Sequence, residues 1–399
     1  MIRIFMFDGK TNVCRPVDVC ACTLKIIAMT EILFIISGFL VSVLLGVVLI
    51  SNILTISYRK KLFDLPDARK VHSVPVPRLG GFSFLPVVLV TVCMVTGFHY
   101  YAGFGTAGLF PSSSAYELLL LAVGSTSLYL TGIADDLVGI GYRSKFVVQL
   151  ATALLFVLSG NWIDNFDGLL GICEIPAWLG MPFTVVLVVY ITNAINLIDG
   201  IDGLASGLCA IAFAAMGTLL AIRGEYVYAL LSFSFLGVLV PFWIYNVFGN
   251  VQHHRKLFMG DAGSLTLGYV LSYLAIHLSK GSDSTTLGTC SDMAFAFSTL
   301  LVPLFDVVRV VLCRLREGKN PFMPDQNHIH HKLLRAGLTP RKAMATILSI
   351  SVSFIILNVV MDESIGFTWM FVCDILLWTI LQLQINRYIK ARQSKNADF

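Results

Sequence analysis

Long apolar runs alternate with short polar stretches along this chain. A helix needs roughly 17 to 25 apolar residues to cross ~30 Å of hydrocarbon. Eleven runs reach or nearly reach that length, and they predict an all-α, polytopic integral membrane protein with about 11 transmembrane helices. The runs lie at about 32–56, 82–99, 117–134, 146–160, 181–198, 204–222, 226–245, 264–279, 293–312, 344–361 and 366–386.

Composition agrees with this interpretation. The chain is 56% hydrophobic and only 13% charged, far too little charge for a soluble protein of 399 residues. Its net charge of +4 is modest and favours no nucleic-acid partner. The nine cysteines show no paired CxxC spacing, so they indicate neither a zinc site nor a disulfide framework.

The basic residues predict how the chain is oriented in the bilayer. Of the 28 Lys and Arg, 22 fall in segments that follow odd-numbered runs, and only Arg223 and Lys280 fall on the other face. The remaining four lie in residues 1–28. Because Lys and Arg concentrate in cytoplasmic loops, we expect the N-terminus outside and the C-terminus in the cytoplasm.

Residues 1–28 differ from the rest in their mixed polarity and lack of periodicity. Met29 stands just before the first long apolar run, so we expect the natural start at Met29. Residues 1–28 would then be a disordered or untranslated extension, and residues 29–399 a single transmembrane domain.

Five polar clusters all fall on the predicted cytoplasmic face. They read RKVHSVPVPRLGG, ADDLVGIGYRSK, NLIDGIDG, KLFMGDAGS and PDQNHIHHKLL. Loops on the opposite face, such as NWIDNFDG, hold acids that are not set among glycines and bases in this way. This one-sidedness predicts a functional surface at the cytoplasmic ends of the spans.

The acids in these clusters are Asp135, Asp136, Asp199, Asp202 and Asp261. Carboxylates beside hydrocarbon are costly and are usually paired, metal-bound or functional. Their hard oxygens suit Mg²⁺, which takes one or two carboxylates together with water and substrate phosphates. The alternative is that each aspartate caps a helix, but five on one face make capping alone a poor explanation.

Glycines flank these acids at 200, 203, 260 and 263. We expect them to let a bulky anion such as a diphosphate approach the backbone. Helix–helix packing is the alternative, and we assign Gly207 and Gly268 to it.

Basic side chains lie on the same face, and most of them would merely set topology and contact lipid headgroups. They are Lys70, His72, Arg78, Arg143, Lys145, Arg255, Lys256 and Lys332. The run HIHH, with His328, His330 and His331, is rarer. It is compatible with a zinc site, with Asp325 nearby, or with phosphate and sugar binding.

Four motifs carry a family resemblance: GIADDLVGIGYRSK, NAINLIDGIDGLASG, FMGDAGSL and NHIHHKLL. In order and spacing they resemble the polyprenyl-phosphate N-acetylhexosamine-1-phosphate transferases, the superfamily of glycosyltransferase family 4. The resemblance covers about residues 31–340 and fades into two less specific spans. It implies that residues 29–399 are a transmembrane transferase domain of the inner membrane.

The resemblance also implies chemistry. Such enzymes use Mg²⁺, with Mn²⁺ as an alternative, to transfer a phospho-sugar from a UDP-N-acetylhexosamine to undecaprenyl phosphate, releasing UMP. The family's magnesium-binding aspartate is similar to Asp261, and Phe258 resembles the aromatic that stacks on uracil. Asn196 and Lys145 match polar positions of the family's cleft. Lys70 and Arg78 lie in a stretch similar to its first cytoplasmic loop.

HIHHKLL resembles the group that uses UDP-N-acetylglucosamine or a similar sugar to start cell-envelope polysaccharides such as O-antigen lipopolysaccharide. The phospho-N-acetylmuramoyl-pentapeptide transferases of peptidoglycan synthesis are the alternative within the superfamily. A transporter, a CDP-alcohol phosphotransferase and a membrane scaffold are the alternatives outside it. Homodimers occur in the superfamily, and the sequence leaves that state open.

We expect Asp261 to be the surest metal ligand and Asp199 a second one. Asp135, Asp136, Asp199 and Asp202 are the candidate catalytic acids, and Asp135 or Asp136 could deprotonate the acceptor. The candidate substrate-binding residues are Lys70, Arg78, Lys145, Asn196, Phe258, His328, His330 and His331. A direct displacement is simpler than a two-step route through an aspartyl phosphate.

Overall fold

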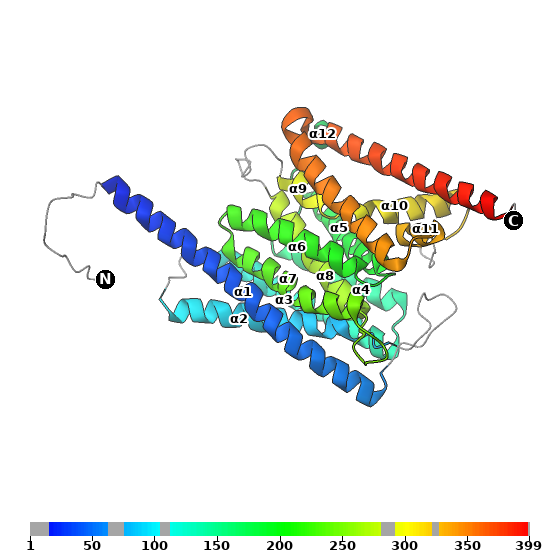
Figure 1. Ribbon diagram of the computed structural model, residues 1–399. Coiled ribbons are helices and arrows are strands. Elements are labelled where there is room, and N and C mark those ends of the chain that lie inside the picture. The colour runs from blue at the N-terminus through cyan, green and yellow to red at the C-terminus, as the bar shows by residue number, and fades with distance from the viewer. Residues whose placement is uncertain (1–15, 63–75, 104–111, 281–291, 321–326, 398–399) are drawn as a thin grey trace.

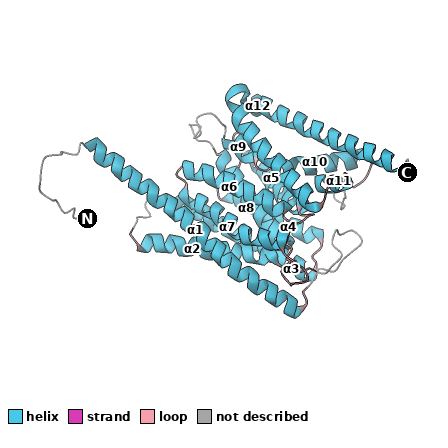
Figure 2. Ribbon diagram, viewed as in Figure 1, coloured by secondary structure: helices cyan, strands magenta, loops and turns pink. Residues whose placement is uncertain are grey.

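The computed structural model describes residues 16–62, 76–103, 112–280, 292–320 and 327–397. Within these ranges the regular structure is helical, apart from isolated bridge residues such as the pair Asn165 and Glu174 (Figure 2). The α-helices are α1 (Pro16–Lys60), α2 (Phe84–Tyr101), α3 (Ser112–Val138), α4 (Tyr142–Leu158), α5 (Ala177–Ile198), α6 (Leu204–Ile222), α7 (Tyr226–Phe248), α8 (Gly260–Ser279), α9 (Asp292–Ser298), α10 (Leu301–Arg316), α11 (Ile329–Arg335) and α12 (Pro340–Ala397).

The all-α class is confirmed, but the number of spans differs from eleven. In the described part of the chain, nine helices are long and apolar enough to cross a membrane, or ten if α9 and α10 form one span bent by 67°. The run at 146–160 became α4, which at 17 residues is about 25 Å long and falls short of the hydrocarbon thickness. The orientation of the termini stays a prediction.

Two of the predicted runs share one element. The runs at 344–361 and 366–386 both lie in α12, whose halves Pro340–Met361 and Ile365–Ser394 each qualify as spans. The chain turns between them at Gly366, which has φ 70° and ψ 159°, a conformation that favours glycine.

Helix α8 lies at the centre of the bundle. All of its residues except His277 are buried, and it packs against α3, α5, α6 and α9. Helices α1 and α2 lie together on one flank, where α1 also contacts α7, and the two halves of α12 lie on the opposite flank (Figure 1). Because α8 faces protein rather than lipid, it can carry serine, threonine and tyrosine along its length.

Several helices meet through backbone atoms. A methyl group added to Gly132 of α3 would overlap the backbone of Ala262 in α8. One added to Gly268 would lie 2.8 Å from Thr192 Cα, and one on Gly207 would lie 2.9 Å from Leu348. The packing role predicted for Gly207 and Gly268 is confirmed, and the contact at Gly132 fixes the end of α3 against the start of α8.

The backbone of α1 is helical from Pro16, so part of the stretch expected to be an extension continues the first helix. Whether residues 1–28 precede the natural start stays a prediction.

Candidate active site

Three helix ends bring the predicted acids together. Asp135 and Asp136 lie in the last turn of α3, Asp199 directly follows α5, and Asp261 is the second residue of α8. Asn196 Nδ2 of α5 donates a hydrogen bond to Ser264 Oγ of α8 at 2.8 Å. The motifs near residues 135, 199 and 261 therefore occupy the same end of the bundle.

Asp136 caps α8 from outside that helix. Its two carboxylate oxygens accept hydrogen bonds from the backbone N–H groups of Asp261 (2.9 Å) and Ala262 (3.0 Å). These amides have no partner within their own helix, and the helix dipole favours a negative charge there. Asp136 therefore caps a helix, as the alternative interpretation of the aspartates predicted, and this contact holds the backbone of Asp261 in place.

Lys145 joins two of the motifs. Its Nζ lies 2.7 Å from Asp135 Oδ2 and 2.6 Å from Asp261 Oδ2. Asp135 Oδ1 also accepts a hydrogen bond from Ile140 N at 2.7 Å, and Arg78 lies 3.9 Å from Asp261 Oδ1. Lys145 and Arg78, which come from two different motifs, therefore both lie beside the Asp261 carboxylate.

Asp199 differs from its neighbours. Within the described residues its carboxylate makes no hydrogen bond or ion pair. Its side chain is accessible to solvent, but many protein atoms lie around it. That surrounding protein raises the pKa of Asp199 to about 7, which Arg78 opposes and the charge of Asp261 reinforces. Asp202, by contrast, is paired with Lys256 Nζ at 2.5 Å.

The donor set fits a hard divalent cation bound together with substrate. Among the described residues, no group of three or more His, Cys, Asp or Glu side chains is arranged to hold a metal ion. Mg²⁺ does not require one, because one or two carboxylates suffice when water and phosphates complete its shell. In the described part of the chain, the Asp199 carboxylate has no hydrogen-bond partner, and the Asp261 carboxylate contacts Lys145, Arg78 and Asp135. These two ligands stay a prediction.

The histidine run lies against the DGIDG motif. His330 is 1% exposed, and its ring packs on the backbone of Gly200. Burial, together with the neighbouring His331 and His328, lowers the pKa of His330 to about 3, so its ring is neutral. The rings of His328 and His330 are nearly parallel, with centroids 5.9 Å apart.

Phe258 and Arg78 belong to two segments that are joined through their backbones. Phe258 N donates to Pro77 O at 2.8 Å, and Gly80 N donates to Phe258 O at 2.9 Å. The predicted uracil-binding aromatic is therefore held three residues before Asp261. Lys70, His72 and Asp325 lie outside the described residues.

Protein atoms fill the space where a side chain on the flanking glycines would lie, and their ligand role stays a prediction. A methyl group on Gly200 would overlap His330, and one on Gly260 would overlap the backbone of Arg78. Those on Gly203 and Gly263 would also overlap neighbouring protein atoms. These glycines let protein segments approach closely, as the packing alternative predicts.

The sequence interpretation missed Asp306 and Arg309. Asp306 is fully buried on α10 and contacts His328, as described below. Both residues lie inside the apolar run at 293–312, three positions apart. An acid and a base at that spacing within a span were the signal that could have identified them.

A second group of ionisable residues was also missed. At the other end of α3 and α8, Glu117 Oε2 accepts hydrogen bonds from Asn161 (3.0 Å), Tyr228 (2.9 Å) and Tyr273 (2.9 Å). His277 bonds Glu225 through Nε2, and its Nδ1 lies 3.7 Å from Glu117 Oε2. We call these six residues the distal polar cluster.

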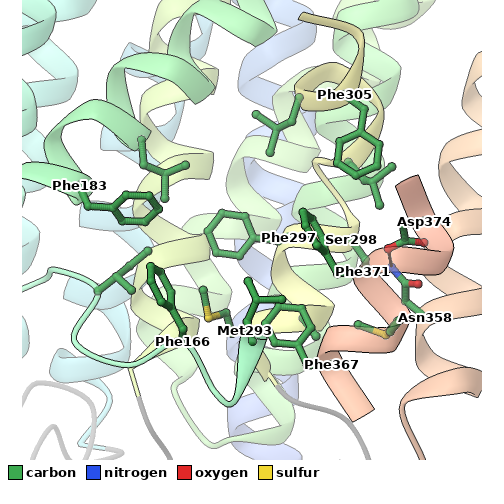
Figure 3. Close-up of a pocket in the computed structure, with 17 residues that line it drawn as sticks. Phe166, Phe183, Met293, Phe297, Ser298, Phe305, Asn358, Phe367, Phe371 and Asp374 are labelled. Atoms are coloured by element: carbon green, nitrogen blue, oxygen red, sulfur yellow. Dashed lines mark hydrogen bonds between the residues drawn. The ribbon is translucent and has the colours of Figure 1, made fainter. Parts of the chain in front are cut away.

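A cavity of about 240 Å³ has none of the five site aspartates in its lining (Figure 3). Ile163, Phe166 and Leu169, which lie between α4 and α5, line it together with side chains from α5, α9, α10 and α12, and most are aromatic or aliphatic. Asn358 and Asp374, joined by a 3.0 Å hydrogen bond, are at its edge. A diphosphate would find no cationic group in this lining.

The comparisons with known proteins agree with the geometry. Residues 118–279 match the model of "Glycosyl transferase family 4". The "Probable undecaprenyl-phosphate N-acetylglucosaminyl 1-phosphate transferase" of Bacillus subtilis (strain 168) is 31% identical over 86% of this chain and 89% of its own length. The "Undecaprenyl-phosphate alpha-N-acetylglucosaminyl 1-phosphate transferase" of Escherichia coli (strain K12) is 30% identical over 72% of each chain.

The chain is thus a multi-pass membrane enzyme of the phospho-sugar transferase class. It belongs to glycosyl transferase family 4. Membership of this family implies dependence on a divalent metal.

Proposed function

We propose that this protein transfers an N-acetylhexosamine 1-phosphate, with N-acetylglucosamine 1-phosphate favoured, from a UDP-sugar to undecaprenyl phosphate and releases UMP. The observation that carries the proposal is the convergence of three helix ends, where Lys145 bridges Asp135 and Asp261 beside the open carboxylate of Asp199. The names of the relatives support the acceptor and the sugar.

In the proposed reaction an oxygen of the lipid phosphate attacks the β-phosphorus of the UDP-sugar. The bond between that phosphorus and the bridging oxygen breaks, and UMP carries the bridging oxygen away. Phosphoryl transfer depends mainly on positioning and charge neutralisation. Lys145, Arg78 and Lys256 supply positive charge around the acids.

The acids divide into distinct roles. Asp199 and Asp261 would hold Mg²⁺, or Mn²⁺ in its place, and the bound ion would neutralise charge on the diphosphate. Asp136 holds the start of α8, and Asp135 and Asp202 hold Lys145 and Lys256. A general base is not required, because a phosphate monoester with a second pKa of about 6 is largely dianionic at neutral pH.

The setting we propose is the inner membrane, with the N-terminus outside, the C-terminus in the cytoplasm and the carboxylates at the cytoplasmic surface. The distribution of Lys and Arg supports this orientation. There a water-soluble donor meets a lipid acceptor, and the product would start a lipid-linked polysaccharide of the cell envelope.

The test incubates the purified protein and Mg²⁺ with undecaprenyl phosphate and a panel of UDP-N-acetylhexosamines, with mass spectrometry of the lipid product. We expect a lipid diphosphate carrying one sugar, together with UMP. No lipid-linked product from any donor would contradict the proposal. Uptake of labelled solute into proteoliposomes without such a product would favour a transporter instead.

A further inference from the structure

Asp306 makes several interactions from one fully buried position on α10. Its Oδ2 lies 2.9 Å from His328 Nδ1, and its two oxygens accept from Ile329 N at 3.1 and 3.2 Å. Arg309, one turn along α10, donates to Asp306 Oδ1 at 2.7 Å and to Asn327 O at 2.5 Å. The carboxylate thus joins α10 to the first residues of the histidine run.

This contact settles the state of one ring nitrogen. A carboxylate that accepts from Arg309 and from a backbone amide is ionised and can only accept, so His328 Nδ1 must carry the hydrogen. The other nitrogen, Nε2, lies on the far side of the ring and faces away from Asp306. A carboxylate hydrogen-bonded to one histidine nitrogen fixes both the tautomer and the orientation of the ring.

His328 and His330 therefore differ in environment. His330 is buried against Gly200, and neither of its ring nitrogens has a hydrogen-bond partner among the described residues. His328 has a carboxylate partner on one side, and His330 lies between it and the backbone that follows Asp199. The contact with Asp306 thus holds the outward nitrogen of His328 in a defined direction.

We propose that Asp306 is a positioning residue that presents His328 Nε2 to the UDP-sugar. This inference rests on the proposed function. The donor, rather than the lipid, is the substrate concerned, because the seven-residue α11 is not among the candidate spans and lies between the end of α10 and the start of α12. Arg309 offsets the charge of Asp306, since a buried carboxylate without partners is costly.

The test is a double-mutant cycle on the full-length protein. Asp306→Asn should lower kcat/KM about 10- to 100-fold, the range seen when carboxylates that orient histidines are removed. The loss should appear in KM for the UDP-sugar, with KM for the lipid phosphate unchanged. His328→Asn keeps a side-chain N–H near the position of Nδ1 but removes Nε2, and it should cause a similar loss.

The double variant separates positioning from a structural role. If Asp306 acts by orienting His328 Nε2, adding Asp306→Asn to His328→Asn should not lower kcat/KM any further. Such nonadditivity identifies residues that act as a unit. Additive losses, or an equal rise in KM for both substrates, would overturn the inference and leave the proposed function intact. A wild-type protein that transfers no sugar phosphate would overturn both.

Asp374→Asn is the matched control. Asp374 is also a buried aspartate, 3% exposed, and it is hydrogen-bonded to Asn358 rather than to the histidine run. The same chemical change there should leave both KM values unchanged. Thermal melting of all variants in detergent reports any loss of folding. A donor-specific rise in KM for Asp374→Asn would also overturn the inference.

Discussion

Helices α3 and α8 pack together and carry ionisable residues at both ends, but the two ends are built differently. At the distal polar cluster, Glu117 accepts three hydrogen bonds, and Glu225 is paired with His277. At the other end, Asp135 and Asp261 share the single Lys145, and Asp199 nearby has no partner within the described residues.

The difference shows how one helix pair uses charge for two purposes. The distal end is closed, because Glu117 and Glu225 already have partners inside the protein. Among the described residues, the site end has five aspartates and the cations Arg78, Lys145 and Lys256, so the acids outnumber the cations there. Such an excess is unfavourable in the free protein and becomes favourable when a cation binds. Four predictions test this contrast.

The largest effect should follow from Asp261→Asn. The change removes a carboxylate held by Lys145 and proposed to bind metal, so transfer should fall below about a thousandth of the wild-type rate. Radiolabelled lipid product measures the rate, and thermal melting verifies that the protein is folded. Asp199→Asn should behave in the same way. Near-normal turnover in both variants would show that the open end is not the reaction site.

The next effect should come from Gly132→Ala. The added methyl group would overlap the backbone of Ala262, so α3 and α8 must separate at the site end. We expect a loss of about 3 kcal/mol in the free energy of unfolding, together with a loss of activity. The control is Gly97→Ala in α2, where an added methyl group meets open space. If both variants melt alike, the backbone contact does not hold the site together.

Glu117→Gln tests the closed end. Removing the charge from a side chain that accepts three hydrogen bonds should lower the free energy of unfolding by about 2 to 3 kcal/mol. Turnover per folded molecule should stay within about twofold of wild type, because the cluster does not reach the carboxylates. Melting curves and kcat on the same sample separate the two effects. A selective fall in kcat would mean that the ends are coupled.

The smallest effect concerns acid sensitivity at His330. Its pKa is about 3 in the folded protein and about 6.5 when unfolded, so the unfolded chain binds more protons between these values. Stability should therefore decline as the pH falls below 6.5, by about 2 kcal/mol between pH 7 and pH 5. His330→Asn should remove this dependence from melting curves recorded against pH. An unchanged pH dependence would exclude His330 as its source.

Most of the architecture could be predicted because length and hydropathy alone identify a span. The sequence located the runs, the paired aspartates and Asp261. The sequence could not show that α4 is too short to count as a membrane span, or that the chain bends between α9 and α10. Both depend on a few residues at helix ends, where helical and non-helical conformations differ little in free energy.

The site was harder to predict, because pairing across the bundle is invisible in one sequence. Nothing in the spacing shows that Asp136 caps α8 or that Lys145 reaches Asp261. The sequence could not separate the two roles of the glycines, because close approach by a ligand and close approach by protein require the same absent side chain. Asp306 and Arg309 could be recognised as a pair from their spacing, but the contact of Asp306 with His328, 22 residues away, could not be recognised from the sequence.

Under the proposed function, the contacts of Gly132 and Gly200 have a consequence for the choice of sugar donor. Where α3 contacts α8, the backbone of Gly132 lies against the backbone of Ala262. Substituting side chains there cannot change the distance between the aspartates of α3 and Asp261 without disturbing the fold. Gly200, by contrast, contacts the side chain of His330, and substitution of that residue can change the contact. Attempts to broaden the range of sugars accepted should therefore vary α11 and leave the α3–α8 junction untouched.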